Sequence, residues 1–377
     1  MSKIIGEIVK PWIKYKKLTG TYGLEIEAET DCSSDYPSGF FEEKYTSKKT
    51  LYVLPTLPNW EGHIDNSLRN FGMEFVFKKP LSYSAAISAL NDFGEKTKRV
   101  NFIKGSPSTS VHVHWNITQE TFKTLANFIA IYMLYENVLT AYSGPTRRSN
   151  LFALPMRVSE QIVDNFIKMV KLVEAGNYKA LKWDMYQTKY GALNPANLGT
   201  LGSLEIRPFR GTTNIEEVKS WLTIIHQMVE FSRKTSVTPQ TILDMYQNHP
   251  DELDQQIFQN LLSDLRATAE GEFEMLVQKN LWFLAMFVES TSDWNKFGEY
   301  FEEISDKYQE KNDLVALKMK EAIKTHGHPT TQKLFGDDSQ PTPQGQEWEY
   351  LLGMSNGNFE VNPVPSPLED IIDWEDE

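Results

Sequence analysis

The sequence has a single cysteine, Cys32, among its 377 residues. No disulfide bond can form within one chain, which is typical of proteins in a reducing cytoplasm. Long apolar runs are also missing: the longest, residues 128–135, is far short of the roughly 20 residues that a membrane-spanning helix needs. The N-terminal residues contain no apolar segment of signal-peptide length. We therefore expect a cytoplasmic protein that is not embedded in a membrane.

The common phosphate-binding loops are absent as well. No glycine is followed by lysine, which excludes a Walker A loop, and the pattern G-x-G-x-x-G does not occur. Basic side chains are missing from residues 334–377, which contain eleven acidic ones, whereas residues 1–333 carry 38 basic and 40 acidic side chains. Nucleic-acid binding is therefore not indicated. We expect residues 327–377 to be a disordered acidic tail and a candidate segment for binding a protein partner.

The rest of the chain has enough apolar residues to bury a sizeable core, since 40 % of the whole sequence is hydrophobic. Short segments alternate apolar and polar residues with the period of two that is typical of half-buried β-strands. They are GLEIEAE at 23–29, MEFVF at 73–77, SVHVHWNI at 110–117 and SLEIRPF at 203–209. Residues 238–326 show mainly helical periodicity instead. We therefore expect a first domain over residues 1–237, a helical region over residues 238–326, and then the acidic tail.

The polar positions of these strands share one face of each strand. They carry acidic, imidazole and guanidinium groups: Glu25, Glu27, Glu29, Glu74, His112, His114, Glu205 and Arg207. A sheet with one face in water also produces such alternation, but solvated faces usually include Lys, Thr, Ser and Gln. Neighbouring carboxylates repel one another unless a cation lies among them. The pattern is compatible with a solvated face and favours one that binds cations.

The donor atoms of this face suit a hard divalent cation. One imidazole among several carboxylates fits Mg²⁺ or Mn²⁺ better than zinc. A zinc hydrolase built on the His-x-His pair is an alternative, but the chain has only seven histidines to supply further ligands. Arg207 and Arg210 would present planar donors to a phosphate group bound by the same ions. A site for a metal-bound polyphosphate is therefore indicated.

An ordered set of motifs spans this part of the chain: GLEIEAE, a D-x-S-L element at Asp65, GMEFVFKKPLS, SVHVHWN, YENVL, RRSN, KYGALN and LEIRPFRGTTN. In this order the chain resembles the amidoligase family, which is grouped with glutamine synthetase and glutamate–cysteine ligase among carboxylate–amine ligases. The resemblance runs from about Thr21 to Arg233, a little over half the chain. One departure is the pair Thr109–Ser110, where the family usually has Cys-Gly.

The resemblance implies an α+β fold, with a curved, mainly antiparallel sheet like that of glutamine synthetase and flanking helices. It implies ATP and two or three Mg²⁺ ions, with Mn²⁺ as a substitute. The γ-phosphoryl group would pass to a carboxylate, and an amine would then attack the acyl phosphate to form an amide. The substrates would be small-molecule or peptide carboxylates and amines. A catalytically inactive descendant of the fold and a metal-dependent hydrolase are the alternatives.

The resemblance also implies roles for individual residues. The metal ligands would be Glu25, Glu27, Glu74, His112 and Glu205. The catalytic residues that stabilise the transferring phosphoryl group would be Arg207 and Arg210. The cofactor-binding residues would be Arg147, Lys189, Tyr190 and Asn194, and the substrate-binding residues Asp65, Ser67 and His114. Of the two histidines, His112 matches the family's ligand position, so we expect its replacement to be the more damaging.

Overall fold

The structure is a computed structural model that describes residues 4–6, 20–32, 35–45, 50–65, 68, 71–106, 108–147, 153–156 and 190–290. The described residues combine helices with strands that form one open antiparallel sheet, so the predicted α+β class is confirmed. The strands are β1 (Tyr22–Ala28), β2 (Glu42–Tyr45), β3 (Thr50–Val53), β4 (Trp60–Ile64), β5 (Met73–Phe77), β6 (Ser110–Asn116), β7 (Leu193–Asn194) and β8 (Ser203–Arg210).

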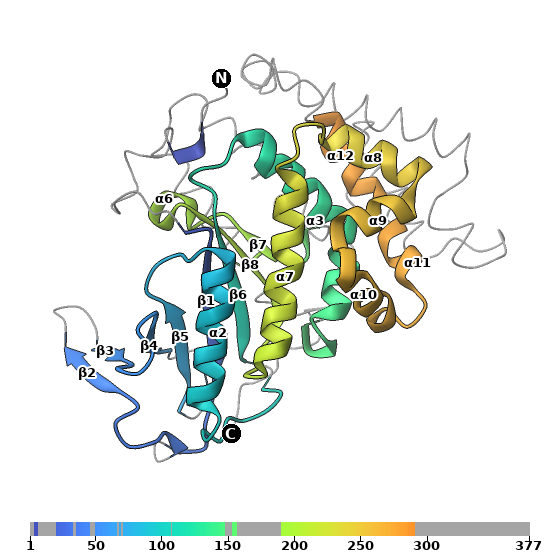
Figure 1. Ribbon diagram of the computed structural model, residues 1–377. Coiled ribbons are helices and arrows are strands. Elements are labelled where there is room, and N and C mark those ends of the chain that lie inside the picture. Colours follow the sequence, from blue (N-terminus) through green and yellow to red (C-terminus); the bar gives the residue numbers. More distant parts are fainter. Residues whose placement is uncertain are drawn as a thin grey trace, which may run out of the picture. The chain divides into compact units, whose positions relative to one another are not determined.

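The sheet has the strand order β2-β3-β4-β5-β1-β6-β8-β7, so β5 and β1 lie at its centre (Figure 1). The four strands that the alternation predicted, β5, β1, β6 and β8, are adjacent in this order. Their register places Glu27 of β1 opposite Glu74 of β5, and Glu25 of β1 opposite His112 of β6. It also places His114 of β6 opposite Glu205 of β8. The pairing thus brings the polar positions of four strands onto one region of one face.

The apolar face of the sheet is covered by α2 (Tyr83–Thr97), α3 (Phe122–Tyr142) and α7 (Ile215–Ser232). Ring pairs join strands to helices: Phe75 with Phe93 of α2 at 5.1 Å between centroids, Trp115 with Phe128 of α3 at 4.8 Å, and Phe209 with Trp221 of α7 at 4.9 Å. These aromatic pairs bury large apolar areas and fix how each helix lies on the sheet. The opposite face is left to the polar side chains.

Helix α3 is enclosed by protein on nearly all sides, since residues 125–139 are all buried. Its outer side is covered by α8 (Pro239–Asn248), α9 (Pro250–Phe258), α10 (Leu262–Thr268), α11 (Phe273–Gln278) and α12 (Leu281–Ser290), which follow in sequence (Figure 1). Polar contacts tie these layers together: Tyr135 donates to Asp254 at 2.5 Å, and Asn137 donates to Asn280 at 2.9 Å. A helix that is apolar all round requires such a cover.

Polar side chains cap the first turns of three helices. Ser82 caps α2 and accepts from the amide of Ala85, and Asn214 caps α7 and accepts from the amide of Glu216. Thr121 caps α3 and accepts from the amide of Thr124. Residues 30–62, which are rich in Ser, Pro, Asp and Gly, contain β2, β3 and the start of β4.

The described residues lie within one compact unit, Met1–Glu302. The predicted boundaries after residues 237 and 326 stay predictions, and the acidic tail lies outside the described residues. The elements within residues 239–290 are helices joined by short turns. Within the described ranges, none of the helices combines the length and the apolarity that crossing a membrane requires.

Candidate metal centre

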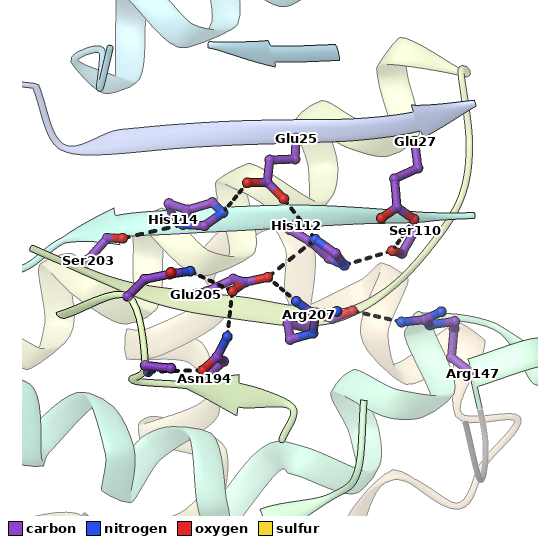
Figure 2. Close-up of polar contacts among 12 residues, drawn as sticks. Glu25, Glu27, Ser110, His112, His114, Arg147, Asn194, Ser203, Glu205 and Arg207 are labelled. Carbon is purple, nitrogen blue, oxygen red and sulfur yellow. Dashed lines mark hydrogen bonds and ion pairs between the residues drawn. The ribbon is translucent and has the colours of Figure 1, made fainter. Parts of the chain in front are cut away.

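The face of the sheet opposite the helices carries a cluster of ionisable side chains from β1, β6 and β8. Figure 2 shows Glu25 of β1 directed toward the two histidines of β6 and Glu27 of β1 directed toward Ser110, with Glu205 of β8 on the other side of the histidines. Strand alternation explains the arrangement, because residues two apart point to the same face and the register aligns the three strands. The cluster is largely withdrawn from water: His112 is 3 % exposed and Glu205 is also 3 % exposed.

Three of these residues can hold a metal ion. Glu25, His114 and Glu205 each offer one ligand atom, and the three atoms all lie within 4.8 Å of one another. Nε2 of His114 lies 2.8 Å from Oε1 of Glu25, yet it has no hydrogen bond of good alignment although it is buried. Two carboxylates and an imidazole form a donor set that suits a divalent cation, and a bound cation would satisfy this nitrogen. The residues therefore fit a metal ion.

His112 bridges the two carboxylates of this group. Its Nδ1 lies 3.0 Å from Oε2 of Glu25 and 3.3 Å from Oε1 of Glu205. Its Nε2 lies 2.7 Å from Oγ of Ser110, and that hydroxyl donates to Oε2 of Glu27 at 2.6 Å. A continuous chain of polar contacts therefore runs along this face, from Glu27 to Glu205.

The carboxylate of Glu205 is oriented by donors at both oxygens. Asn194 and Asn197 donate their side-chain amides to Oε2, at 2.6 and 2.8 Å. Oε1 accepts from Nη1 of Arg207 in a close ion pair. Nδ1 of His112 lies 3.3 Å from the same oxygen, so both carboxylate oxygens have donors beside them. Glu205 is thus held in one orientation.

Crowding of carboxylates changes the pKa of Glu74. Burial, followed by the negative charges of Glu25 and Glu27, raises the pKa of Glu74 to about 9. Glu74 is therefore protonated at neutral pH unless a cation offsets the repulsion. A strongly perturbed carboxyl group in a polar cluster is typical of functional sites.

The pair formed by Glu25 and His114 is charged. Burial alone would raise the pKa of Glu25, but the charge of His114 and then the hydrogen bond from His112 outweigh it and hold this pKa well below its usual range. Burial would lower the pKa of His114, but the negative charges of Glu25 and Glu205 raise it to about 9. Without a metal ion, positive charge on His114 therefore balances Glu25.

A bulge in β8 sets the direction of Arg207. Val113 pairs with Ile206, but Val111 pairs with Phe209, so Arg207 and Pro208 together stand opposite His112. Arg147, which is 4 % exposed, donates through Nε to the carbonyl of Pro208 at 3.0 Å and through Nη2 to the carbonyl of Arg207 at 2.9 Å. Bulges commonly redirect a side chain next to a functional site. Here the arginine predicted to bind cofactor braces the bulge.

The other predicted site residues lie farther from the metal group or outside the described residues. Arg210 donates to the carbonyl of Tyr142 at 3.0 Å and to Glu217 at 2.9 Å. Asp65 follows β4 and contributes to the raised pKa of Glu74. Tyr190 is 45 % exposed and precedes β7 in the sequence. The remaining two, Ser67 and Lys189, are not among the described residues.

Three site residues were not assigned from the sequence. Ser110 was noted only as a departure from the family pattern, and the sequence offers no sign that its hydroxyl joins Glu27 to His112. Ser203, the first residue of β8, shares a face with Glu205, and its Oγ lies 3.3 Å from Nδ1 of His114. Asn197 stands three residues after Asn194 in a turn, and this spacing was its only signal.

The cluster therefore combines carboxylates, two imidazoles and two arginines on one face of an antiparallel sheet. This arrangement can bind a divalent cation and, beside it, an anion. The likeness to amidoligases stays a prediction drawn from motifs. Neither a scan against protein-family models nor a search of the curated proteins found a match to this chain.

Proposed function

We propose that the protein is an ATP- and Mg²⁺-dependent ligase that joins a carboxylate to an amine. The observation that carries this proposal is the buried group of Glu25, His114 and Glu205, with Arg207 paired to Glu205. Phosphoryl transfer depends on positioning and on neutralising charge, more than on a protein nucleophile. A cation-binding group next to an arginine supplies both requirements.

The residues divide into two roles under this proposal. Glu25 and Glu205, together with an imidazole, would hold one Mg²⁺, and Glu27 with Glu74 would contribute to a second. Magnesium would supply charge neutralisation at the phosphate oxygens of ATP. The guanidinium of Arg207 would donate to the same phosphate oxygens. The backbone of Arg207 lies in the bulge of β8, and Arg147 holds it there through a hydrogen bond to its carbonyl. Arg210 would act on a phosphate only after exchanging its contact with Glu217.

The fold supports the finer proposal of a sheet like that of glutamine synthetase. The sheet is antiparallel, helices cover one face, and the polar cluster occupies the other. Two substrates that bind on this face would contact the same group of side chains. The curvature of the sheet and its kinship with glutamine synthetase belong to the proposal.

The test is ATP consumption in the presence of Mg²⁺, measured across a panel of amino acids, peptides and other carboxylates, each with and without amines. A ligase should release ADP or phosphate only when both an acid and an amine are present. A metal-dependent hydrolase should need no amine. An inactive descendant should neither bind Mg²⁺-ATP nor turn it over, and either result would replace the ligase proposal.

Replacing Glu205 by Gln should lower the rate of ATP turnover by at least about 100-fold and leave the fold intact. The amide keeps the shape of the side chain but loses the negative charge that binds the cation, and such charge stabilisation accounts for rate effects of this size. Glu120→Gln is the matched control, because Glu120 is equally buried and ion-paired, with Arg233 as its partner. Steady-state kinetics and circular dichroism are the measurements; full activity in Glu205→Gln would remove Glu205 from the site.

A further inference from the structure

The two histidines of β6 lie one residue apart on the same face, but their ring nitrogens differ in environment. Both nitrogens of His112 have partners: Ser110 at Nε2, and the carboxylates of Glu25 and Glu205 at Nδ1. These contacts are 2.7, 3.0 and 3.3 Å long, all within hydrogen-bond distance. The hydrogen-bonding capacity of His112 is therefore in use.

Ser110 determines how the ring of His112 is held. Its hydroxyl has one hydrogen, which is donated to Oε2 of Glu27 at 2.6 Å. The contact of 2.7 Å with His112 then requires the Nε2–H of the imidazole to donate and the hydroxyl oxygen to accept. The serine is 5 % exposed, so water competes little for these bonds. The ring of His112 is fixed at one edge, with Nδ1 directed between Glu25 and Glu205.

His114 has a different arrangement. Nδ1 lies 3.3 Å from Oγ of Ser203, whereas Nε2 lies 2.8 Å from Oε1 of Glu25 without the alignment of a hydrogen bond. Two ligands at right angles, each about 2.1 Å from an ion, lie about 3.0 Å apart. A buried nitrogen that approaches a carboxylate oxygen this closely, and off the hydrogen-bond axis, has the spacing of two ligands of one cation.

We propose that His114 supplies the metal-ligating nitrogen, and that His112, anchored by Ser110, is a positioning residue for Glu25 and Glu205. This gives His114 the role of metal ligand that the motif resemblance implied for His112. The inference rests on the metal site of the proposed function and deepens it. Ser110, at a position where amidoligases usually have glycine, would be a positioning residue of this chain in particular.

The test uses Mn²⁺ as the probe and does not depend on turnover. Electron spin-echo spectroscopy of bound Mn²⁺ detects nitrogen nuclei of a coordinated imidazole, and labelling the wild type with [¹⁵N]histidine identifies the coupling. His114→Asn should lose the coupling. His112→Asn should keep it, while its affinity for Mn²⁺ falls by about 10- to 100-fold, as is usual when a partner that orients ligands is removed. His114→Gln and His112→Gln repeat the comparison if an Asn variant does not fold.

The role of Ser110 has its own comparison. Ser110→Ala should weaken Mn²⁺ binding about tenfold or more and leave the nitrogen coupling unchanged. Ser110→Thr, which keeps the hydroxyl, should restore most of the affinity. Ser108→Ala is the control, because Ser108 also donates to a glutamate of the same chain segment, Glu29, at 2.8 Å, yet lies outside the metal group. The affinity of Ser108→Ala for Mn²⁺ should equal that of the wild type.

Each result decides between assignments. Loss of the coupling in His112→Asn together with its survival in His114→Asn would reverse the two roles, and wild-type protein without any imidazole coupling would also overturn the proposal. If Ser110→Ala and Ser108→Ala bind Mn²⁺ with equal affinity, Ser110 is not a positioning residue of the metal site. A wild type that does not bind Mn²⁺ would overturn both this inference and the metal site beneath it. Binding with the predicted coupling but without ATP turnover would overturn the ligase proposal alone.

Discussion

His114 lies between two negative charges in a buried setting, and this determines when it is protonated. Its pKa is raised to about 9, because the charges of Glu25 and Glu205 outweigh the effect of burial. In the unfolded chain a histidine has a pKa near 6.5. The folded state therefore binds the proton more tightly, and the protonated imidazole contributes to stability in protein freed of metal.

In chelator-treated protein, we expect the free energy of unfolding to fall as the pH rises. The contribution of His114 is fully present below about pH 6.5 and is lost as the pH rises through about 9. The loss should reach up to about 3 kcal/mol, because one pKa unit corresponds to about 1.4 kcal/mol. Urea denaturation at a series of pH values, with His114→Gln as the comparison, measures it. An equal pH dependence in both proteins would contradict this account.

At the scale of elements, the bulge in β8 is held by a residue far away in the sequence, Arg147. The bulge exposes the carbonyls of Arg207 and Pro208, and the buried guanidinium of Arg147 binds both of them. Burial, and to a lesser extent the neighbouring charge of Arg207, lowers the pKa of Arg147 to about 10, so it remains charged at neutral pH. The planar fork of arginine matches two adjacent carbonyls in a way that lysine does not.

Arg147→Lys should therefore lower the free energy of unfolding by roughly 3 kcal/mol, because it removes hydrogen bonds from a charged group and leaves buried carbonyls without partners. Arg210→Lys is the control. Arg210 pairs with Glu217 where both side chains are about one-third exposed, and such pairs contribute about 1 kcal/mol or less. Chemical denaturation of both variants tests the difference; similar losses would mean that the brace has no special role.

The strands were predictable where one face is buried and the other is charged, as in β1, β5, β6 and β8. The short strands β2 and β3 were not, because the surrounding Ser, Pro, Asp and Gly indicate turns, and only the pairing of β2 with β3 and of β3 with β4 makes them strands. The bulge was hidden by the regular alternation of residues 203–207, although Pro208 within a strand was a signal for it. Contacts such as those of Ser110 and Asn197 depend on cross-strand register, which no local pattern specifies.

At the scale of the whole molecule, the helices after residue 238 and the sheet depend on each other through α3. We expect a chain ending at Glu302 to fold and to bind Mn²⁺ like the full chain, because Met1–Glu302 forms one compact unit. A chain ending at Val237 should fail to fold, because it would expose the buried residues 125–139 of α3 to water. Cooperative thermal unfolding of the shorter chain would show that residues 1–237 are an independent domain.

An open sheet presents two outer strands, and each is a potential template for a strand from another molecule. In the sheet as described, one outer strand is β7, which is only two residues long. The other, β2, contains Glu42 and Glu43, both exposed, at its start. The short length of β7 and the two glutamates of β2 disfavour pairing of either edge with a strand of another molecule. The part of the sheet that the structure describes can thus carry its polar cluster without inviting self-assembly along its edges.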